Sequence, residues 1–311
     1  MKKSIRVFAP ATVANVVCGF DVLGFAVNEP GDEVIMRLTD KPGISLLKIT
    51  GDEGRLPLSP DKNTVSAIAK HYLEHIGRPD VGIEIELHKK MPIGSGLGSS
   101  SASTVAGLFA INTLFDNALT NKELVPFAMK GEELACGYGH ADNVAPALLG
   151  GFVLIRSYSP LDIISLPFPQ DLHAAIVYPE VDVPTKDARQ MIRSKVLLKD
   201  AVTQWGNVAG LVSGLFMNDY ELIGRSMTDV LVEPTRSILI PDFDRLRELA
   251  MAAGAVGFGI SGSGPSVFAL TKDAETAKRI TQQLQQHLKD IAINSLAFVS
   301  EVNKKGPIIL D

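Results

Sequence analysis

Cysteine is scarce in this 311-residue chain. Cys18 and Cys136 lie far apart, form no CxxC pair, and have no histidine at the spacing of a metal site. The sequence therefore contains neither a cysteine-based zinc site nor the disulfide framework of a small secreted protein. This cysteine usage is typical of a reducing compartment, and we expect a cytoplasmic protein.

Positive charge is also limited. The 30 Lys and Arg residues are outnumbered by 35 Asp and Glu residues, which leaves a formal net charge of -5. A protein that binds nucleic acid through its phosphates usually has the opposite balance. We therefore expect no nucleic-acid partner.

The sequence has no convincing membrane segment. Residues 91–115 and 249–271 are uncharged and long enough to cross a bilayer, but Gly, Ser and a Pro interrupt both runs. At the start of the sequence, Arg6 and Pro10 interrupt the apolar stretch that a signal peptide needs. We expect no membrane partner.

Hydrophobic residues make up 46% of the chain, which is enough to build a sizeable core. The segment 83–87 alternates apolar and acidic residues, as a half-exposed strand does, whereas 63–76 has helical periodicity. Strands and helices mix without a regular βα repeat, which favours an α+β fold. The Ser- and Pro-rich stretch 157–170 predicts a boundary between domains 1–160 and 161–311.

Two further patterns predict helices. Thr120 and Glu123 have the spacing of a capping box, which places a helix start there. In the second half, apolar residues recur at helical spacing and predict a buried helix face, which is made of Val202, Trp205, Ala209, Val212 and Phe216.

The strongest local signal is a loop rich in glycine and serine. Its glycines at alternate positions let the backbone curl around a ligand, and the serines that follow lie where a helix begins. Free N–H groups and the helix dipole favour an anion there, and phosphate is the ligand that we expect. A serine-capped turn without a ligand is the simpler alternative. The loop comprises Pro92, Ile93, Gly94, Ser95, Gly96, Leu97, Gly98, Ser99, Ser100, Ser101 and Ala102.

Two common phosphate loops do not fit these residues. No Gly-Lys-Ser or Gly-Lys-Thr occurs, so the loop is not a Walker A motif. Ser99 stands where a dinucleotide fingerprint requires its third glycine.

Three other segments, read with this loop, decide the interpretation. They are PATVAN with GFDVLG at 10–24, HADNVAPA at 140–147, and GFGISGSGPS at 257–266. In this order they resemble the motifs of the GHMP small-molecule kinases. HADNVAPA, PTKDAR at 184–189 and EPTRSILIP at 233–241 resemble the homoserine kinases within that superfamily. The resemblance implies an N-terminal domain like domain 2 of ribosomal protein S5 and a ferredoxin-like C-terminal domain.

The resemblance also implies a nucleotide site for ATP and Mg²⁺. The glycine–serine loop would hold the phosphates, and Asn63 would lie on the adenine side. Ser100 and Glu133 would hold Mg²⁺, a hard cation that prefers oxygen ligands. The Glu-Leu-Ala context selects Glu133 over its neighbour Glu132.

For the second substrate, the resemblance implies a pocket made of Asn15, Asp21, Asn143, Arg189 and Arg236. Arginine forks suit a carboxylate, and Asp21 suits an ammonium group. Asn143 and Thr185 would position the reacting groups. No general base is evident, because an amide cannot accept the proton; Asp142 is the alternative.

The activity implied is ATP-dependent phosphorylation of the side-chain hydroxyl of L-homoserine, in threonine biosynthesis, by a homodimer. One alternative is another GHMP kinase that acts on an isoprenoid precursor or a sugar, although the two arginines argue for a carboxylate-bearing substrate. The other is a catalytically inactive metabolite-binding member, although the loop glycines and the candidate metal ligands are all present.

Overall fold

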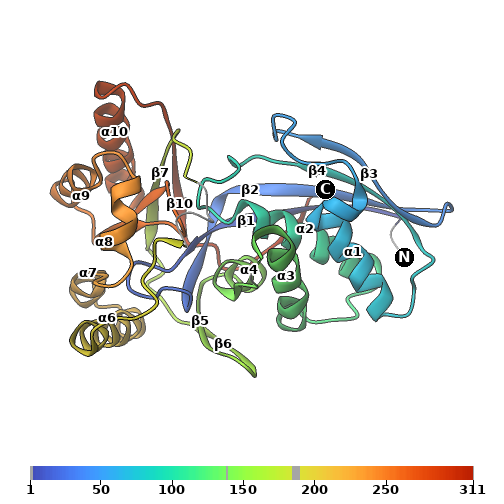
Figure 1. Ribbon diagram of the computed structural model, residues 1–311, viewed down its shortest axis with the longest axis horizontal. Helices are drawn as coiled ribbons and strands as arrows, with labels where there is room; N and C mark the ends of the chain where they lie inside the picture. Colours follow the sequence, from blue (N-terminus) through green and yellow to red (C-terminus); the bar gives the residue numbers. More distant parts are fainter. Residues whose placement is uncertain (1–2, 138, 184–189, 311) are drawn as a thin grey trace.

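The computed structural model describes residues 3–137, 139–183 and 190–310. It contains two sheets with helices packed against them (Figure 1). Helices and strands mix without a βα repeat, so the predicted α+β class is confirmed. In the described residues, no helix is long and apolar enough to cross a bilayer.

The first sheet is mostly antiparallel and follows the order β11-β1-β2-β4-β3, with the hairpin β5–β6 added through β2. Among the described strands of this sheet, only β3 and β4 pair in parallel. Its strands are β1 (Ser4–Ala14), β2 (Leu23–Thr39), β3 (Gly43–Thr50), β4 (Gly82–His88), β5 (Phe152–Tyr158), β6 (Leu161–Leu166) and β11 (Ile308–Leu310). The predicted alternating strand at 83–87 is β4, with its isoleucines buried and its glutamates partly exposed.

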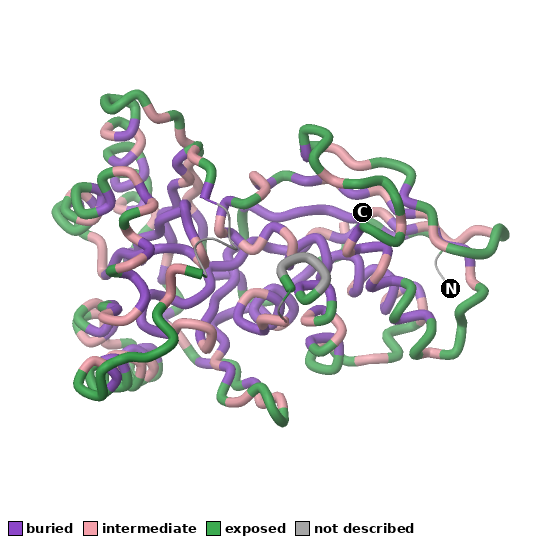
Figure 2. Tube along the Cα trace, viewed as in Figure 1, coloured by how far each residue is buried: buried purple, intermediate pink, exposed green. Residues whose placement is uncertain are grey.

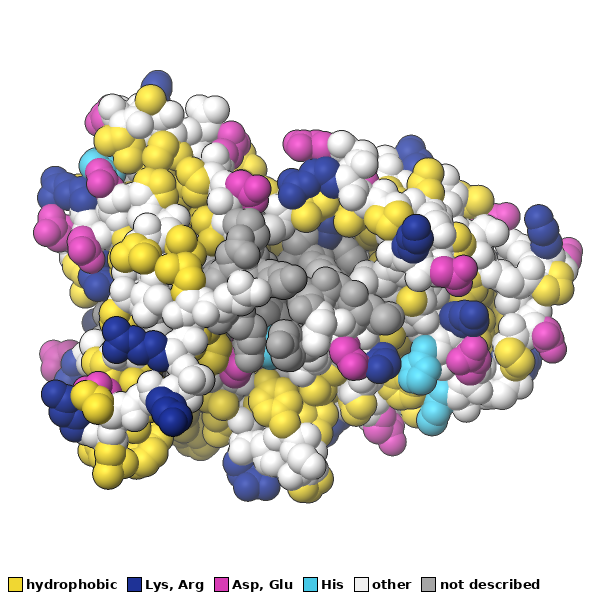
Figure 3. Space-filling view, in the orientation of Figure 1, with side chains coloured by type: hydrophobic (Ala, Val, Ile, Leu, Met, Phe, Trp, Pro, Cys, Tyr) yellow, Lys and Arg dark blue, Asp and Glu magenta, His cyan; other side chains and the backbone are white. Residues whose placement is uncertain are grey.

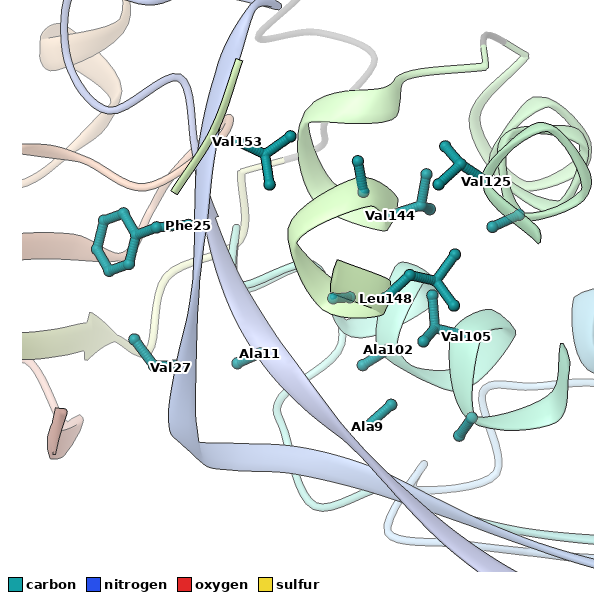
Figure 4. Packing of buried hydrophobic residues seen from close by; sticks show 14 of the residues in the cluster. Ala9, Ala11, Phe25, Val27, Ala102, Val105, Val125, Val144, Leu148 and Val153 are labelled. Atoms are coloured by element: carbon teal, nitrogen blue, oxygen red, sulfur yellow. The ribbon is translucent and has the colours of Figure 1, made fainter. Parts of the chain in front are cut away.

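Four helices cover one face of this sheet (Figure 1). They are α1 (Thr64–His75), α2 (Ser99–Leu114), α3 (Asn121–Cys136) and α4 (Ala141–Leu149). The predicted capping box at Thr120 and Glu123 is present at the start of α3. Small residues let α2 lie close to the sheet, since Ala102 of α2 faces Ala9 and Ala11 of β1 across the core (Figure 4).

The second sheet is antiparallel, with the order β10-β7-β9-β8. Its strands are β7 (His173–Pro179), β8 (Gly257–Ile260), β9 (Val267–Thr271) and β10 (Ser295–Glu301). Helices α9 (Phe243–Ala252) and α10 (Ala274–Asp290) pack on it and share a second core. Helices α6 (Leu198–Met217), α7 (Tyr220–Ser226) and α8 (Glu233–Arg236) complete this part.

The two parts are joined through a continuous core, which runs as an unbroken buried band across the molecule (Figure 2). Phe25 of β2 stacks on Phe152 at 4.7 Å and meets Phe268 of β9 at 5.8 Å between ring centroids. The chain also returns at its end to pair β11 with β1. Residue 160, where the boundary between domains is predicted, lies in the turn of the β5–β6 hairpin.

The predicted helix at 202–216 is present as α6, but its predicted burial is wrong. Trp205 and Phe216 are exposed, and Leu211 and Leu215 on another side of the helix enter the core. Spacing shows that a helix has an apolar face, and it does not show which face a neighbour covers.

Candidate active site

The glycine–serine loop runs from β4 to α2 in a conformation that glycine favours. Gly94, Gly96 and Gly98 all have positive φ, at 76°, 81° and 66°. A Cβ on Gly98 would lie 2.2 Å from Thr12 Oγ1, so only glycine fits there. Gly98 is also the N-cap of α2, and no side chain caps the helix. The first N–H groups of α2 are therefore available to an anion.

The turn after β8 packs directly on this loop. The Ser261 hydroxyl donates to the Gly96 carbonyl at 2.8 Å, and the Ser266 N–H donates to the Ser95 carbonyl at 3.1 Å. A Cβ on Gly96 would lie 2.5 Å from the Ser261 carbonyl oxygen. The second part of the molecule thus fixes the shape of the phosphate loop.

The end of β1 connects the loop to the other motifs. The Thr12 N–H donates to the Leu97 carbonyl at 3.1 Å, and the Thr12 hydroxyl donates to Asn143 Oδ1 at 2.7 Å. Asn15, at a φ of 71°, donates through Nδ2 to the Gly262 carbonyl at 2.9 Å. Segments that are more than 100 residues apart in the sequence therefore meet around the loop.

Buried polar atoms around α2 have unused hydrogen-bonding capacity. The hydroxyls of Ser95, Ser99 and Ser101 and the Oε1 atom of Glu132 have no hydrogen-bond partner within the part of the chain that the structure describes. Buried polar groups are normally paired, so a cluster of unpaired ones indicates a ligand site. Oxygen atoms and free N–H groups together suit a metal-bound phosphate.

The two adjacent glutamates of α3 have different surroundings. Glu132 is 6% exposed, and burial raises the pKa of its carboxyl, although the nearby hydroxyls of Ser101 and Ser100 act in the opposite direction. The Glu133 side chain is 49% exposed and pairs with Lys130 at 2.6 Å. Successive helix residues point about 100° apart, so only one glutamate can face α2. Glu132 is therefore the carboxylate that lies near Ser100 and Ser101, whereas the resemblance implied that Glu133 would share the Mg²⁺ with Ser100.

Sequence reasoning missed a buried ion pair beneath the loop. The Lys89 ammonium pairs with Asp32 and donates to the Ser99 carbonyl and the Ser103 hydroxyl, each at 2.8 Å. Lys89 also lies close enough to Glu132 to favour its ionised form. The pair ties the first turn of α2 to β2. In the sequence, only the two adjacent lysines directly after strand β4, Lys89 and Lys90, could have indicated this ion pair.

Arg236 is buried at the end of α8. Its Nη1 donates to the Gly262 carbonyl at 3.0 Å, and its guanidinium lies 5.2 Å from the Phe20 ring centroid. Asp229 fixes the start of α8 by accepting the N–H groups of Val232 and Glu233, at 3.1 and 2.8 Å. Asn15, Phe20, Glu233, Arg236 and Gly262 line one recess. The structure thus brings together two of the residues predicted for the amino-acid pocket, Asn15 and Arg236.

Asp21 and Asn63 have more local roles. Asp21 Oδ1 lies 3.8 Å from His140 Nδ1, and its backbone carbonyl accepts the Tyr158 hydroxyl at 2.7 Å. Asp21 therefore lies near the start of α4, and it is not among the residues lining the recess of Arg236. The Asn63 side chain caps α1 by accepting the Val65 N–H at 3.0 Å. The predicted positions Thr185 and Arg189 lie outside the described residues.

The comparisons with known proteins address the whole chain. The GHMP kinases N terminal domain model matches residues 63–151, and the GHMP kinases C terminal model matches 209–290. A homoserine kinase of Chlorobium phaeobacteroides is 47% identical over 99% of this chain and 100% of its own length. A homoserine kinase of Xylella fastidiosa is 36% identical over 98% of this chain and 94% of its own. The chain belongs to the homoserine kinase family.

Solved structures agree with this membership. The crystal structure of homoserine kinase from Cytophaga hutchinsonii has 60% identity and a TM-score of 0.97, and the match covers 100% of this chain and 98% of that one. Mevalonate kinase of L. major, at 16% identity and a TM-score of 0.73, shares the fold, with 97% of this chain and 98% of that chain covered. The expected resemblance to the homoserine kinases and the expected two-domain GHMP kinase fold are therefore confirmed.

Proposed function

We propose that this member of the homoserine kinase family transfers the γ-phosphoryl group of ATP to the side-chain hydroxyl of L-homoserine, giving O-phospho-L-homoserine for threonine biosynthesis. One observation carries the proposal. The glycine loop, with its positive φ angles, lies between Asn143 on one side and the contact of Arg236 with Gly262 on the other. The end of β1 thus links the proposed phosphate site to Arg236, the side chain proposed to bind the substrate carboxylate.

The loop backbone and the first turn of α2 would bind the nucleotide phosphates. Phosphoryl transfer depends mainly on positioning and on stabilising charge, and the helix N-terminus supplies both without any side-chain rearrangement. Asn63 would contribute on the adenine side through its backbone segment, because its side chain is occupied as the cap of α1.

Ser100 and Glu132 would hold Mg²⁺, which neutralises charge on the phosphates when it is bound. The unpaired Oε1 of Glu132 supports this assignment, because an ionised carboxylate so deeply buried needs a counter-charge. Glu133 remains at the surface.

The amino-acid substrate would lie between Asn143 and Arg236. The Arg236 and Arg189 guanidinium groups would bind its carboxylate. Asn15 and Asn143 would orient the hydroxyl, and the Asp21 carboxylate would accept hydrogen bonds from the ammonium group. Asn143 is held in place by the Thr12 hydroxyl, so its Nδ2 remains available to donate toward the substrate oxygen.

No side chain is assigned as a general base. An asparagine amide cannot take a proton, and a loose transition state needs little deprotonation of the nucleophile beforehand. The hydroxyl proton would pass late to an oxygen of the transferred phosphoryl group, with Asn143 and Thr185 as positioning residues.

ADP release with Mg-ATP tests the activity, with L-homoserine measured beside D-homoserine, L-serine, mevalonate and galactose. Strong turnover with L-homoserine alone is the expected result. Turnover with mevalonate or galactose instead would retain the fold and contradict the assignment of the arginines. Binding of ATP without turnover of any of these substrates would indicate an inactive metabolite-binding member.

Location and assembly are finer points of the same proposal. We propose a cytoplasmic enzyme, because the few cysteines suit a reducing compartment. We also propose a homodimer, as the resemblance to the homoserine kinases implies.

A further inference from the structure

The Lys89 side chain is buried, which is unusual for a lysine. Figure 3 shows Lys and Arg side chains spread over the outer surface, with Asp and Glu between them. Lys89, directly after β4, instead pairs with Asp32 of β2, and the two side chains are 2% and 0% exposed. Its neighbour Lys90 pairs with Glu33, and the Lys90 side chain is 52% exposed. Because a buried ion pair rarely stabilises a fold more than apolar residues of similar volume would, the burial of Lys89 needs another explanation.

The Lys89 ammonium group uses all three of its N–H donors beneath the phosphate loop. They go to Asp32, to the Ser99 carbonyl at 2.8 Å and to the Ser103 hydroxyl at 2.8 Å. Ser99 is the first residue of α2, and Ser103 lies about one turn further along the helix. Asp32 is itself fixed, because it accepts the Lys90 N–H at 2.9 Å and the Ser103 hydroxyl at 2.8 Å. The ion pair therefore fastens the first turn of α2 to β2 and to the end of β4.

The same turn of α2 carries the groups that would face the nucleotide. Gly98 leaves its N–H groups uncapped, and within the described chain the hydroxyls of Ser99 and Ser101 have no hydrogen-bond partner. Glu132, proposed as a Mg²⁺ ligand, lies close to Ser101, and its carboxylate and the Lys89 ammonium group attract each other. Lys89 thus acts both on the phosphate-binding backbone and on the carboxylate proposed to bind the metal.

The charges around Lys89 leave a place for a second cation. Three buried carboxyl groups, those of Asp32, Glu132 and Asp52, act on this one ammonium group. A single positive charge does not balance three carboxylates, and such an imbalance is costly in a low-dielectric interior. Mg²⁺ held by Glu132 would supply the missing charge. Lys89 neutralises Asp32 and leaves Glu132 to the metal.

We propose that Lys89 is a positioning residue for the nucleotide. By fastening the first turn of α2 and attracting Glu132, it sets the geometry in which Mg-ATP is bound. It touches neither substrate itself, because its three donors are already used within the fold. This role rests on the proposed kinase activity and concerns only the nucleotide side of the site. Residues that orient metal ligands without touching the metal typically change metal affinity by about 10- to 100-fold when they are replaced.

Two variants separate this role from a purely structural one. Lys89→Met leaves Asp32 buried without its partner, so its Tm should fall well below that of wild type. Lys89→Met combined with Asp32→Asn removes both charges, and the amide can still accept the Lys90 N–H and donate to the Ser103 hydroxyl. The double variant should therefore regain most of the lost Tm without regaining the ammonium group.

Isothermal titration calorimetry with Mg-ADP on the full chain is the direct test, and it requires no turnover. Both variants, measured below their Tm, should bind Mg-ADP about 10- to 100-fold more weakly than wild type. Lys90→Met is the matched control, because it removes the adjacent lysine and an ion pair at the surface, and its affinity should stay within about twofold. Wild-type affinity in either folded variant would overturn the proposal, since the pair would then serve only the fold.

Steady-state kinetics distinguish an effect on the nucleotide from a general loosening of the fold. In the double variant the KM for ATP should rise with the dissociation constant of Mg-ADP. The KM for L-homoserine should stay within about twofold of wild type, because Asn15 and Arg236 lie against Gly262. An equal rise in both KM values would contradict a positioning role for Lys89. A wild type that binds Mg-ADP and does not phosphorylate L-homoserine would count against the proposed reaction alone, and the Mg-ADP affinities would still test Lys89.

Discussion

Replacing different side chains around the loop should affect activity to different extents. Some of these side chains have a neighbour of the same chemistry in a different environment, which serves as a control. Glu132 and Glu133 form such a pair, being adjacent carboxylates on α3, one buried next to α2 and one paired with Lys130 at the surface. Arg236 is different, since its guanidinium is held by a carbonyl and a ring that also line the recess.

Replacing Glu132 by Gln should lower kcat by about 100-fold or more, because charge stabilisation at the phosphates is lost. Glu133→Gln should change kcat less than about twofold, as expected for one exposed ion pair. Steady-state kinetics over a range of Mg²⁺ concentrations measure both. A large loss for Glu133→Gln with little for Glu132→Gln would restore the original sequence-based choice.

The same substitution predicts a pH dependence of stability. Burial raises the pKa of the Glu132 carboxyl above its usual 4.5, so the fold binds this proton more tightly than the unfolded chain does. The carboxyl then destabilises the fold progressively as the pH rises above about 4.5. Without metal, Glu132→Gln should therefore have a higher Tm than wild type at pH 7 and an equal Tm near pH 4. Added Mg-ATP should raise the Tm of wild type more than that of the variant. An unchanged Tm at pH 7 would mean that Lys89 and the nearby serine hydroxyls offset the cost of burying the charged carboxyl.

Arg236→Ala should raise the KM for L-homoserine by about 10- to 100-fold, because each charge-assisted hydrogen bond contributes about 1.5–3 kcal/mol. The KM for ATP should change little, since Arg236 lies on the Gly262 side of the site. Arg236→Lys retains the charge and loses the fork, so it should restore only part of the affinity. An equal loss of affinity for ATP would show that Arg236 serves the nucleotide.

Among the elements, the phosphate loop is the most constrained, and its three glycines are not equivalent. Gly94 and Gly98 both have positive φ, but a Cβ on Gly94 would meet no atom within 4 Å, whereas one on Gly98 would clash with Thr12 and Asn143. Gly94 therefore requires glycine for backbone conformation alone, and Gly98 also requires it for space.

Gly94→Ala should lower the free energy of unfolding by about 1–2 kcal/mol, the cost of a left-handed alanine. Gly98→Ala should lower it further and weaken ATP binding by more than tenfold, because the clash displaces either the loop or Asn143. Chemical denaturation and equilibrium ATP binding measure the two effects. Equal behaviour of the two variants would mean that the Thr12 contact does not define the loop.

Over the whole molecule, the core is continuous between the two sheets. Phe268 of β9 meets Phe25 of β2, and the strand β11 completes the first sheet from the far end of the chain. A unit whose core is supplied in part by the other unit should not be stable alone.

We therefore expect the full chain to unfold in one transition and a fragment of residues 1–160 to remain unfolded or aggregate. The fragment lacks β6, β11 and the apolar residues of β9. Far-UV circular dichroism and hydrogen exchange in β1 and α10 should give the same unfolding midpoint in denaturant. A well-dispersed NMR spectrum of the fragment would contradict this expectation and support independent domains.

The features that the sequence by itself determined are local ones. Alternate glycines before a serine-rich helix start can hardly serve anything but a tight, positive-φ loop, and the loop has that conformation. Three other features likewise depend on residues that are close together in the sequence: the capping box at Thr120, the half-exposed strand at 83–87 and each motif of the family. Dihedral preferences and short-range hydrogen bonds act over a few residues, so a sequence displays them directly.

The tertiary structure decided everything that depends on which surfaces meet. Glu132 faces α2 because of the way α3 packs, and nothing in the local sequence distinguishes it from Glu133 in this respect. The apolar periodicity of α6 is real, but the core takes Leu211 and Leu215 and leaves Trp205 outside. The Lys89–Asp32 pair joins residues 57 positions apart. Each of these depends on packing between distant segments, and a pattern along one segment carries no information about its partner.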